Sequence, residues 1–217
     1  IVTVQILATE VFRVFVWERE CEDQYKTYRL GPYPIHRLVV RIYCFVGYFL
    51  MGISFNWLMV DIAKYTTGRH RPHFMDICRP SVGHTYCTNP TNYIIKYECT
   101  GTFERLVKDS QLSFYSGHAA TSFFVACFTS LYLRARLYQP LLSRLLVPGI
   151  QFCLLLGASY VSLTRISDYM HHWSDVFTGV IMGSIIGIAT ALYIAEVFKR
   201  REVPPCLPTK QYKGLAI

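Results

Sequence analysis

Stretches without a charged side chain place the strongest constraint on this chain. Residues 42–60, 145–163 and 176–195 contain no Asp, Glu, Lys or Arg, and residues 110–133 contain His118 but none of these four. A helix of about 20 residues crosses the roughly 30 Å hydrocarbon core of a bilayer, so these stretches are long enough. With 52% hydrophobic and only 17% charged residues, the composition is not that of an ordinary soluble domain. The sequence predicts an all-α fold, a polytopic transmembrane helical bundle.

The beginning of the chain predicts a further helix. It is apolar, no Met precedes it, and no signal-peptide pattern is visible. We interpret residues 1–15 as the second half of a transmembrane helix, with a short interfacial helix as the alternative. Glu10 and Arg13 suit the end of a span, because charge at the bilayer centre is costly. We expect one N-terminally truncated transmembrane domain over residues 1–200 and a flexible cytoplasmic tail over residues 201–217.

The net charge of +8 could suggest a nucleic-acid partner, but in a multi-spanning protein basic residues more often set the topology. They gather in three regions that share one side if the spans alternate: Arg19, Lys26, Arg29, Arg37 and Arg41; Arg134, Arg136 and Arg144; Lys199, Arg200 and Arg201. We assign that side to the cytoplasm and expect no nucleic acid. Residues 61–115 and 164–174 then face the exterior or the lumen.

The eight cysteines match no zinc-site spacing. Cys78, Cys87 and Cys99 share the long segment on the exterior or lumenal side, where oxidation is possible. We expect one disulfide among them. Cys87 with Cys99 is the candidate pair, but the spacing leaves the pairing open.

Two basic or polar elements lie next to span ends on this side. Lys64 and Arg71 are seven residues apart, which is two helical turns, so both can project from one helix face. The alternative is a collar of positive charge at the membrane surface. Ser116-Gly117-His118 precedes an apolar helix, where backbone N–H groups and the helix dipole favour an anion. The alternative there is a simple helix cap.

A third element runs from Thr164 to Asp175. Asp175 is four residues after His171, so one helical turn would bring its carboxylate to that imidazole and orient it. His172 is the local alternative to His171. A metal site formed by the two histidines and Asp175 is a competing hypothesis, but the cations predicted nearby, including Arg165, would oppose a metal.

Together these elements resemble the type-2 phosphatidate phosphatase superfamily, and most closely the animal lipid phosphate phosphatases. The family pattern is Lys-x6-Arg-Pro, Pro-Ser-Gly-His and Ser-Arg-x5-His-x3-Asp. Two flanking positions depart from it, because Tyr115 replaces a proline and Thr164 a serine. The matching positions are Lys64, Arg71, Pro72, Ser116, Gly117, His118, Arg165, His171 and Asp175. The resemblance covers nearly the whole chain and implies a six-span, haloperoxidase-like bundle that lacks its first span and part of its second.

The resemblance also implies a reaction. Lys64, Arg71 and Arg165 would bind a phosphate monoester without a metal or other cofactor, helped by Ser116 and the N–H of Gly117. His171 would attack phosphorus and form a phosphohistidine, with Asp175 holding its other ring nitrogen. His118 would protonate the departing lipid alkoxide and then activate water.

The usual substrates of the family are phosphatidate, lysophosphatidate, ceramide 1-phosphate and sphingosine 1-phosphate. We expect a protein of the plasma membrane, with an internal membrane as the alternative and the active site facing the exterior or lumen; a homo-oligomer is left open. A catalytically inactive relative acting in signalling or adhesion is the main alternative function. A transporter or channel is less favoured, because its charges should line a path through the spans.

Overall fold

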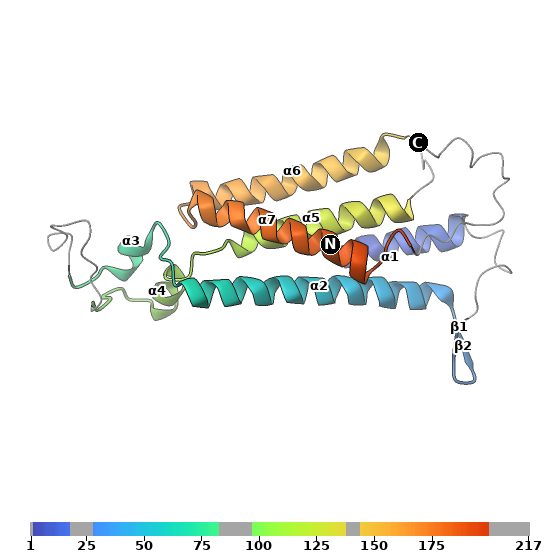
Figure 1. Cartoon of the computed structure of the whole chain (residues 1–217), viewed down its shortest axis with the longest axis horizontal. Helices are drawn as coiled ribbons and strands as arrows, with labels where there is room; N and C mark the ends of the chain where they lie inside the picture. Colours follow the sequence, from blue (N-terminus) through green and yellow to red (C-terminus); the bar gives the residue numbers. More distant parts are fainter. Residues whose placement is uncertain (1, 18–27, 83–96, 138–143, 200–217) are drawn as a thin grey trace. The chain divides into compact units, whose positions relative to one another are not determined.

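The computed structural model describes residues 2–17, 28–82, 97–137 and 144–199 (Figure 1). Cys87 and the predicted tail, residues 201–217, lie outside the described residues. Helices dominate the described part of the chain, as the sequence predicts. In chain order the elements are α1 (Val2–Phe12), η1 (Arg13–Trp17), β1 (Tyr28–Leu30), β2 (Tyr33–Ile35), α2 (Arg37–Thr67), α3 (Phe74–Cys78), α4 (Glu104–Ser110), α5 (Gly117–Arg136), α6 (Leu146–Ser167), α7 (Trp173–Ala189) and η4 (Thr190–Ile194).

The chain forms two compact units. Unit 1 comprises Ile1–Ile53, Val125–Leu154 and Gly187–Ile217, and unit 2 comprises Ser54–Phe124 and Leu155–Ile186. Helices α2, α5, α6 and α7 contribute residues to both. Every site residue predicted from the sequence belongs to unit 2.

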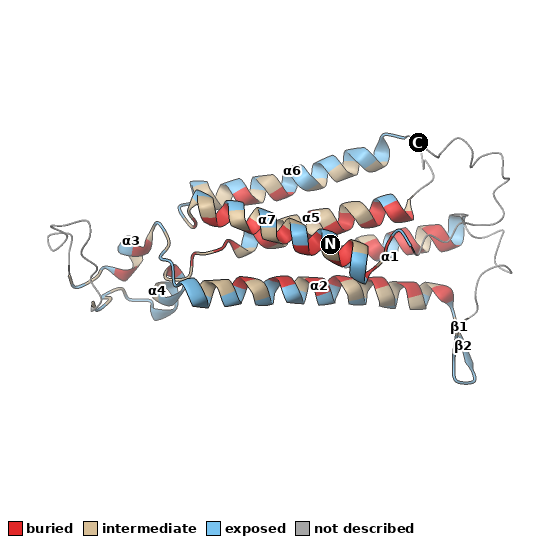
Figure 2. Cartoon of the chain, in the orientation of Figure 1, coloured by how far each residue is buried: buried red, intermediate tan, exposed pale blue. Residues whose placement is uncertain are grey.

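Three of the described helices are long and apolar enough to cross a membrane: α2, α6 and the continuous stretch Trp173–Ile194. The protein is therefore an all-α, multi-pass membrane protein, as predicted. Helix α5 contains the expected span 119–133 and has 20 residues, but it is not among the three. In Figure 2, α5 carries many buried positions, whereas α6 is largely exposed or intermediate. Because much of α5 is buried within the protein, its more polar composition is tolerated.

Helix α2 is longer than a bilayer requires. Its 31 residues extend over about 46 Å at 1.5 Å per residue, so polar residues at both ends lie beyond the apolar stretch. Gly68 ends the helix with a φ of 56°, and its N–H donates to the carbonyl of Lys64 at 3.0 Å. This left-handed glycine is a common helix stop. Arg71 therefore lies outside α2, and the prediction that it shares a helix face with Lys64 is wrong.

A short hairpin precedes α2 and was not predicted. Strands β1 and β2 pair antiparallel, with Leu30 opposite Tyr33. Gly31 occupies the first position of the two-residue turn with a φ of 61°. Glycine reaches this conformation without steric cost, which is why it favours tight hairpins.

A buried ion pair lies in the core of unit 1. The Glu10 carboxylate accepts from Arg136 through Nε and Nη2, both at 2.7 Å, and from the hydroxyl of Tyr132 at 2.9 Å. Glu10 is 0% exposed and Arg136 is 2% exposed. The Arg136 guanidinium also lies 4.9 Å from the ring centre of Phe45. A two-pronged contact of this kind satisfies both charges in a dry environment.

Small residues bring α5 and α7 into close contact within unit 2. A Cβ added to Gly183 would lie 2.1 Å from the Ala120 carbonyl oxygen, and one added to Gly179 would lie 2.6 Å from that of Ser116. Both distances are far below van der Waals contact with backbone atoms that cannot move aside. The four-residue spacing of the two glycines is typical of close helix packing in membranes.

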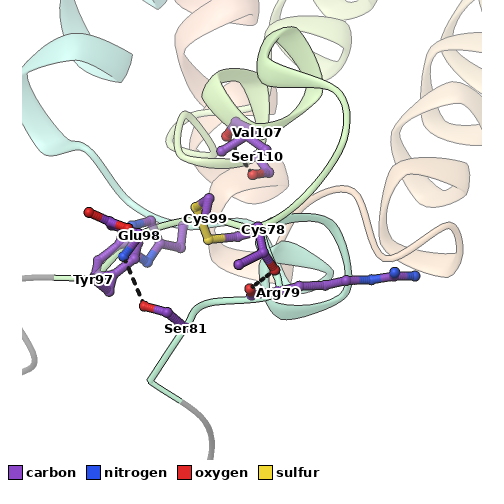
Figure 3. The surroundings of a disulfide bond; sticks show 10 residues. Cys78, Arg79, Ser81, Tyr97, Glu98, Cys99, Val107 and Ser110 are labelled. Carbon is purple, nitrogen blue, oxygen red and sulfur yellow. Dashed lines mark hydrogen bonds between the residues drawn. A yellow bond between two sulfur atoms is a disulfide. The ribbon is translucent and has the colours of Figure 1, made fainter.

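The disulfide of the outer segment joins Cys78 to Cys99 (Figure 3), so the candidate pair of Cys87 with Cys99 is wrong. Cys78 ends α3, and Arg79 then turns the chain with a φ of 46°. An isolated antiparallel bridge pairs Pro80 with Cys99 and brings the two cysteine Cα atoms to 4.7 Å. Long-range pairing of the backbone, which the cysteine spacing does not encode, selects the partner.

Candidate active site

Backbone hydrogen bonds join the first two sequence elements. The N–H of Arg71 donates to the Ser110 carbonyl at 2.8 Å, and the N–H of Ser113 donates to the Arg69 carbonyl at 2.8 Å. The short segment after Gly68 thus lies antiparallel to the segment that leads into α5. These bonds hold the Arg71 backbone beside residues 110–113, which precede Ser116 and His118 in the chain.

Ser116 joins the second element to the third. Its N–H donates to the Asp175 carbonyl at 3.0 Å. Its hydroxyl oxygen accepts from the N–H of Ala119 at 3.4 Å, so Ser116 caps α5 in the manner expected of a serine at this position. The capping contact uses an oxygen lone pair and leaves the hydroxyl proton to donate to a ligand. The cap and the anion site proposed from the sequence are therefore compatible.

Arg71 and Arg165 are both held by acidic residues at the protein surface. Arg71 Nη2 lies 2.9 Å from Asp109, and Arg165 Nη2 lies 3.1 Å from Asp168. The two carboxylates are more than half exposed, whereas both arginines are largely buried. The Nε atom of each arginine is buried and has no hydrogen-bond partner in the described part of the chain. Each of these two guanidinium groups thus has an Nε donor that the described residues leave unpaired.

Lys64 lies next to the start of α5. A Cβ added to Gly117 would lie 3.3 Å from Val60 and 4.0 Å from the Lys64 ammonium nitrogen. Glycine therefore leaves room beside this ammonium group, and a side chain would fill it. The N–H of Gly117 is at the beginning of α5, where the helix dipole favours negative charge.

His118 is exposed at the first turn of α5 and is surrounded by positive charge. Partial burial lowers the pKa of His118, and the charges of Arg165, Lys64 and Arg71 lower it further. The nearby carboxylate of Asp109 acts in the opposite direction. The three predicted cations therefore act on one histidine, as expected of a phosphate site.

His171 is buried, with 3% of its side chain exposed. Its backbone N–H donates to the Arg165 carbonyl at 3.2 Å, which fixes the His171 main chain near the end of α6. Burial is the main reason that the pKa of His171 falls to about 4, with further lowering by Arg71 and Lys64. A backbone hydrogen bond with Ser113 and the charge of Asp175 oppose this shift. His171 is therefore neutral at physiological pH, as a nucleophilic imidazole must be.

Asp175 is fully buried, and its partners differ from the expected ones. Helix α7 begins at Trp173, so His171 lies before the helix and the one-turn spacing does not apply to it. His172 contacts the Asp175 carboxylate instead, through its backbone N–H and through Nδ1, both at 3.2 Å. This backbone contact is the helix-capping bond of an acidic residue in the first turn.

Ser113 and Arg69 complete the surroundings of Asp175, and the sequence interpretation missed both. The Ser113 hydroxyl donates to Oδ2 at 2.5 Å and lies 3.4 Å from Nδ1 of His171. Arg69 Nη1 contacts Oδ1 at 2.6 Å and the Ser174 hydroxyl at 2.8 Å. Arg69 could have been suspected from its charge beside Arg71. No local pattern marks Ser113, which lies 62 residues from Asp175.

The metal hypothesis finds no cluster of ligands. Across the described ranges, no group of three or more His, Cys, Asp or Glu side chains is placed to hold a metal ion. His172 and Asp175 are close together, but Arg69 takes the second oxygen of the carboxylate. The arrangement instead combines a neutral buried histidine, a second histidine among cations, and guanidinium donors, which suits transfer of a phosphoryl group.

Comparisons with known proteins agree with this chemistry. The sequence model described as the PAP2 superfamily matches residues 42–199. Phospholipid phosphatase 1 of Mus musculus is 46% identical over 161 residues, which are 74% of this chain and 56% of that protein. Phospholipid phosphatase 2 of Homo sapiens is 38% identical over 173 residues, 80% of this chain and 59% of that protein. The chain thus spans less than three fifths of these relatives, and no solved structure matches it.

Proposed function

Because this chain belongs to the PAP2 superfamily, we propose that it is a lipid phosphate phosphatase that hydrolyses phosphate monoesters through a phosphohistidine. The observation that carries the proposal is His171, a buried and neutral imidazole whose pKa is lowered by burial and by the charges of Arg71 and Lys64. A neutral imidazole keeps a lone pair for attack, and adjacent cations attract the dianionic substrate. The relatives named phospholipid phosphatase support the same class of reaction.

Substrate binding comes first. The phosphate oxygens contact Lys64, Arg71 and Arg165. The surface carboxylates that pair with the two arginines, Asp109 and Asp168, give way to the more highly charged ligand. The Ser116 hydroxyl and the N–H of Gly117 add hydrogen bonds at the start of α5. These donors neutralise the charge that otherwise repels a nucleophile, and they stabilise the charge on the transferring group.

The phosphoryl group then moves in two steps. Nε2 of His171 forms a bond to phosphorus while the bond from phosphorus to the lipid oxygen breaks, and His118 gives its proton to that oxygen. Neutral His118 next takes a proton from water, whose oxygen attacks the phosphohistidine. The P–N bond breaks, inorganic phosphate leaves, and both histidines return to their initial states. Asp175 stabilises the charge that His171 acquires.

His172 remains the alternative nucleophile, and its direct contact with Asp175 makes the distinction necessary. Two observations favour His171. The charges of Arg71 and Lys64 lower the pKa of His171, which supports a position near the proposed phosphate-binding residues. The Nδ1 atom of His172 instead contacts the Asp175 carboxylate, which also caps α7 by accepting from the His172 backbone N–H.

The proposed substrates share a terminal phosphate and an apolar tail: phosphatidate, lysophosphatidate, ceramide 1-phosphate and sphingosine 1-phosphate. The site contacts the phosphate, which all four have in common. Its residues lie at the ends of apolar helices, where the head group of a membrane lipid is found. We propose that the site faces the exterior or the lumen, as the distribution of basic loops predicts, and that the membrane is the plasma membrane.

Release of inorganic phosphate from short-chain phosphatidate tests the proposal. The purified chain is assayed in lipid nanodiscs with a chelator present, beside its His171→Ala variant and a full-length phospholipid phosphatase as positive control. We expect phosphate from the chain and the control, and none from the variant. Binding of the lipid without release of phosphate would support the inactive, phosphatase-like alternative. Equal activity in intact and permeabilised cells would support the outward-facing site.

A further inference from the structure

A single buried hydroxyl separates the proposed nucleophile from its carboxylate. Ser113 Oγ lies 3.4 Å from Nδ1 of His171 and 2.5 Å from Oδ2 of Asp175, and Ser113 is 0% exposed. The Ser113 backbone is fixed by its bond to the Arg69 carbonyl at 2.8 Å. The serine is thus held in place from its main chain, independently of its side-chain contacts.

The hydroxyl has one proton to donate, and its partners determine where that proton goes. A carboxylate only accepts, so the Ser113 proton points to Asp175 across the shorter of the two contacts. Ser113 Oγ can then only accept from His171, which requires a proton on Nδ1. A neutral imidazole has one N–H, so the lone pair must be on Nε2, the nitrogen that attacks phosphorus.

We propose that Ser113 is a positioning residue that selects the nucleophilic tautomer of His171 and connects it to Asp175. The inference rests on the proposed function, because it assigns His171 as the nucleophile. Through Ser113, Asp175 can determine which ring nitrogen of His171 carries the proton without contacting His171 directly. When His171 becomes charged on phosphorylation, the same hydroxyl transmits the stabilising effect of the carboxylate.

Arg69 fixes the other side of the carboxylate. Its Nη1 atom contacts Asp175 Oδ1 at 2.6 Å and the Ser174 hydroxyl at 2.8 Å, so it bridges two consecutive residues of α7. With Oδ1 held, Oδ2 faces Ser113 and His172. Arg69 is therefore a second positioning residue, and a weaker one, because its side chain is 41% exposed and screened by solvent.

The kinetic test compares two buried serines of the same segment. Ser113→Ala removes the connecting hydroxyl, whereas Ser110→Ala removes a hydroxyl that bonds only to the Val107 carbonyl within its own turn. We expect Ser113→Ala to lower kcat about tenfold to a hundredfold with little change in KM, since the lost hydrogen bond involves charged groups. Ser110→Ala should stay within about twofold of wild type. Equal kcat values for the two variants would overturn the proposal.

A second measurement does not depend on turnover. Nitrogen-15 NMR of labelled histidine reports which ring nitrogen carries the proton, with His171→Asn used to assign the signal. We expect the Nδ1–H form in wild type and a mixture of the two forms in Ser113→Ala. An unchanged tautomer in Ser113→Ala would refute the role of Ser113 even if the enzyme were inactive. Absence of a phosphoenzyme in wild type would instead refute the proposed function.

Three further variants separate the proposed roles of Ser113 and Arg69 from misfolding. Ser113→Cys keeps the size of the side chain but donates weakly, so it should lie between wild type and Ser113→Ala in kcat. Arg69→Gln should lower kcat about fivefold, and Arg69→Lys should restore most of that loss. If Arg69→Lys behaved like Arg69→Gln, the charge of Arg69 would not act through Asp175.

Discussion

Each unit of this protein contains a fully buried carboxylate held by an arginine, and the two differ in what surrounds them. In unit 1, Glu10 is paired with Arg136 and Tyr132, which are themselves buried. In unit 2, Asp175 is paired with Arg69 and His172, which reach the surface. A buried acid with buried partners stabilises the packing of helices. A buried acid whose partners reach the surface can transmit its charge to a substrate.

The cations of the two units differ in the same way. Arg136 contacts Glu10 with two prongs at 2.7 Å, a geometry that a competing anion cannot easily displace. Arg71 and Arg165 contact acids that are more than half exposed, and exposed pairs contribute little free energy. The pairs in unit 2 can be exchanged for a phosphate at small cost. If this difference holds, substitutions in the unit 1 pair should change stability, and substitutions in the unit 2 pairs should change ligand binding or catalysis.

The largest effect is expected at His171. His171→Ala should lower kcat by about four orders of magnitude, as loss of a central catalytic group does, and should remove the labelled phosphoenzyme. His172→Ala should leave measurable activity, because the His172 side chain is proposed only to contact Asp175, and the backbone bond that caps α7 is kept. Labelled phosphate recovered on the His171→Ala protein would transfer the nucleophilic role to another residue.

Arg136→Ala should have the next largest effect, on stability. It leaves Glu10 buried without its main partner, which costs about 3–5 kcal/mol of unfolding free energy. The measurement is thermal unfolding in detergent, with the specific activity of the folded fraction recorded in parallel. We expect a lower unfolding temperature and near-normal kcat. A fall in kcat without a change in stability would contradict a purely structural role for the unit 1 pair.

Asp109→Asn should have a smaller effect, on product inhibition. The substitution removes the surface acid that competes with phosphate for Arg71. Inorganic phosphate should therefore inhibit about two- to fivefold more strongly, the range expected for an exposed pair. Glu104→Gln, on the same helix α4, serves as control and should not change the inhibition constant. Identical phosphate inhibition in both variants would show that the Arg71–Asp109 pair does not compete with ligand.

The smallest effect is a displacement of the pH profile. The proposed reaction requires neutral His171 and protonated His118, so kcat/KM should fall on the acid side near pH 4 and on the alkaline side below 6.5. The Asp109 charge raises the pKa of His118, and Asp109→Asn should therefore move the alkaline limb to lower pH. Ionisation of the substrate is common to both proteins and cancels in the comparison. A shift to higher pH would contradict the assignment of His118 as the acid.

Much of the fold was predictable from local composition. The predicted spans near residues 42–60, 145–163 and 176–195 are helical in the structure. In lipid, a long uncharged stretch satisfies its backbone N–H and C=O groups by forming a helix. The motif spacing also predicted a cluster of Lys64, Arg71 and Arg165, and the charges of all three lower the pKa of His118. Chemistry that needs charged residues next to apolar spans is visible in sequence.

The remaining details depend on contacts between distant segments. Ser113 and Asp175 are 62 residues apart, and Arg69 and Asp175 are 106 apart, so no helical or strand period relates them. The expected contact between His171 and Asp175 assumed a continuous helix, whereas α7 begins between them. The Cys78–Cys99 disulfide likewise depends on a backbone bridge formed only in the folded chain.

The close contact between α5 and α7 bears on how natural variants of this protein should be interpreted. Gly179 has no space for a methyl group, because the obstructing atom is the carbonyl oxygen of Ser116, the residue that caps α5. An apparently conservative change to alanine there must displace the cap, and with it the N–H groups proposed to hold phosphate. A substitution at an uncharged residue of a candidate membrane span is thus expected to disturb the proposed site, although the charged motifs give no indication of it.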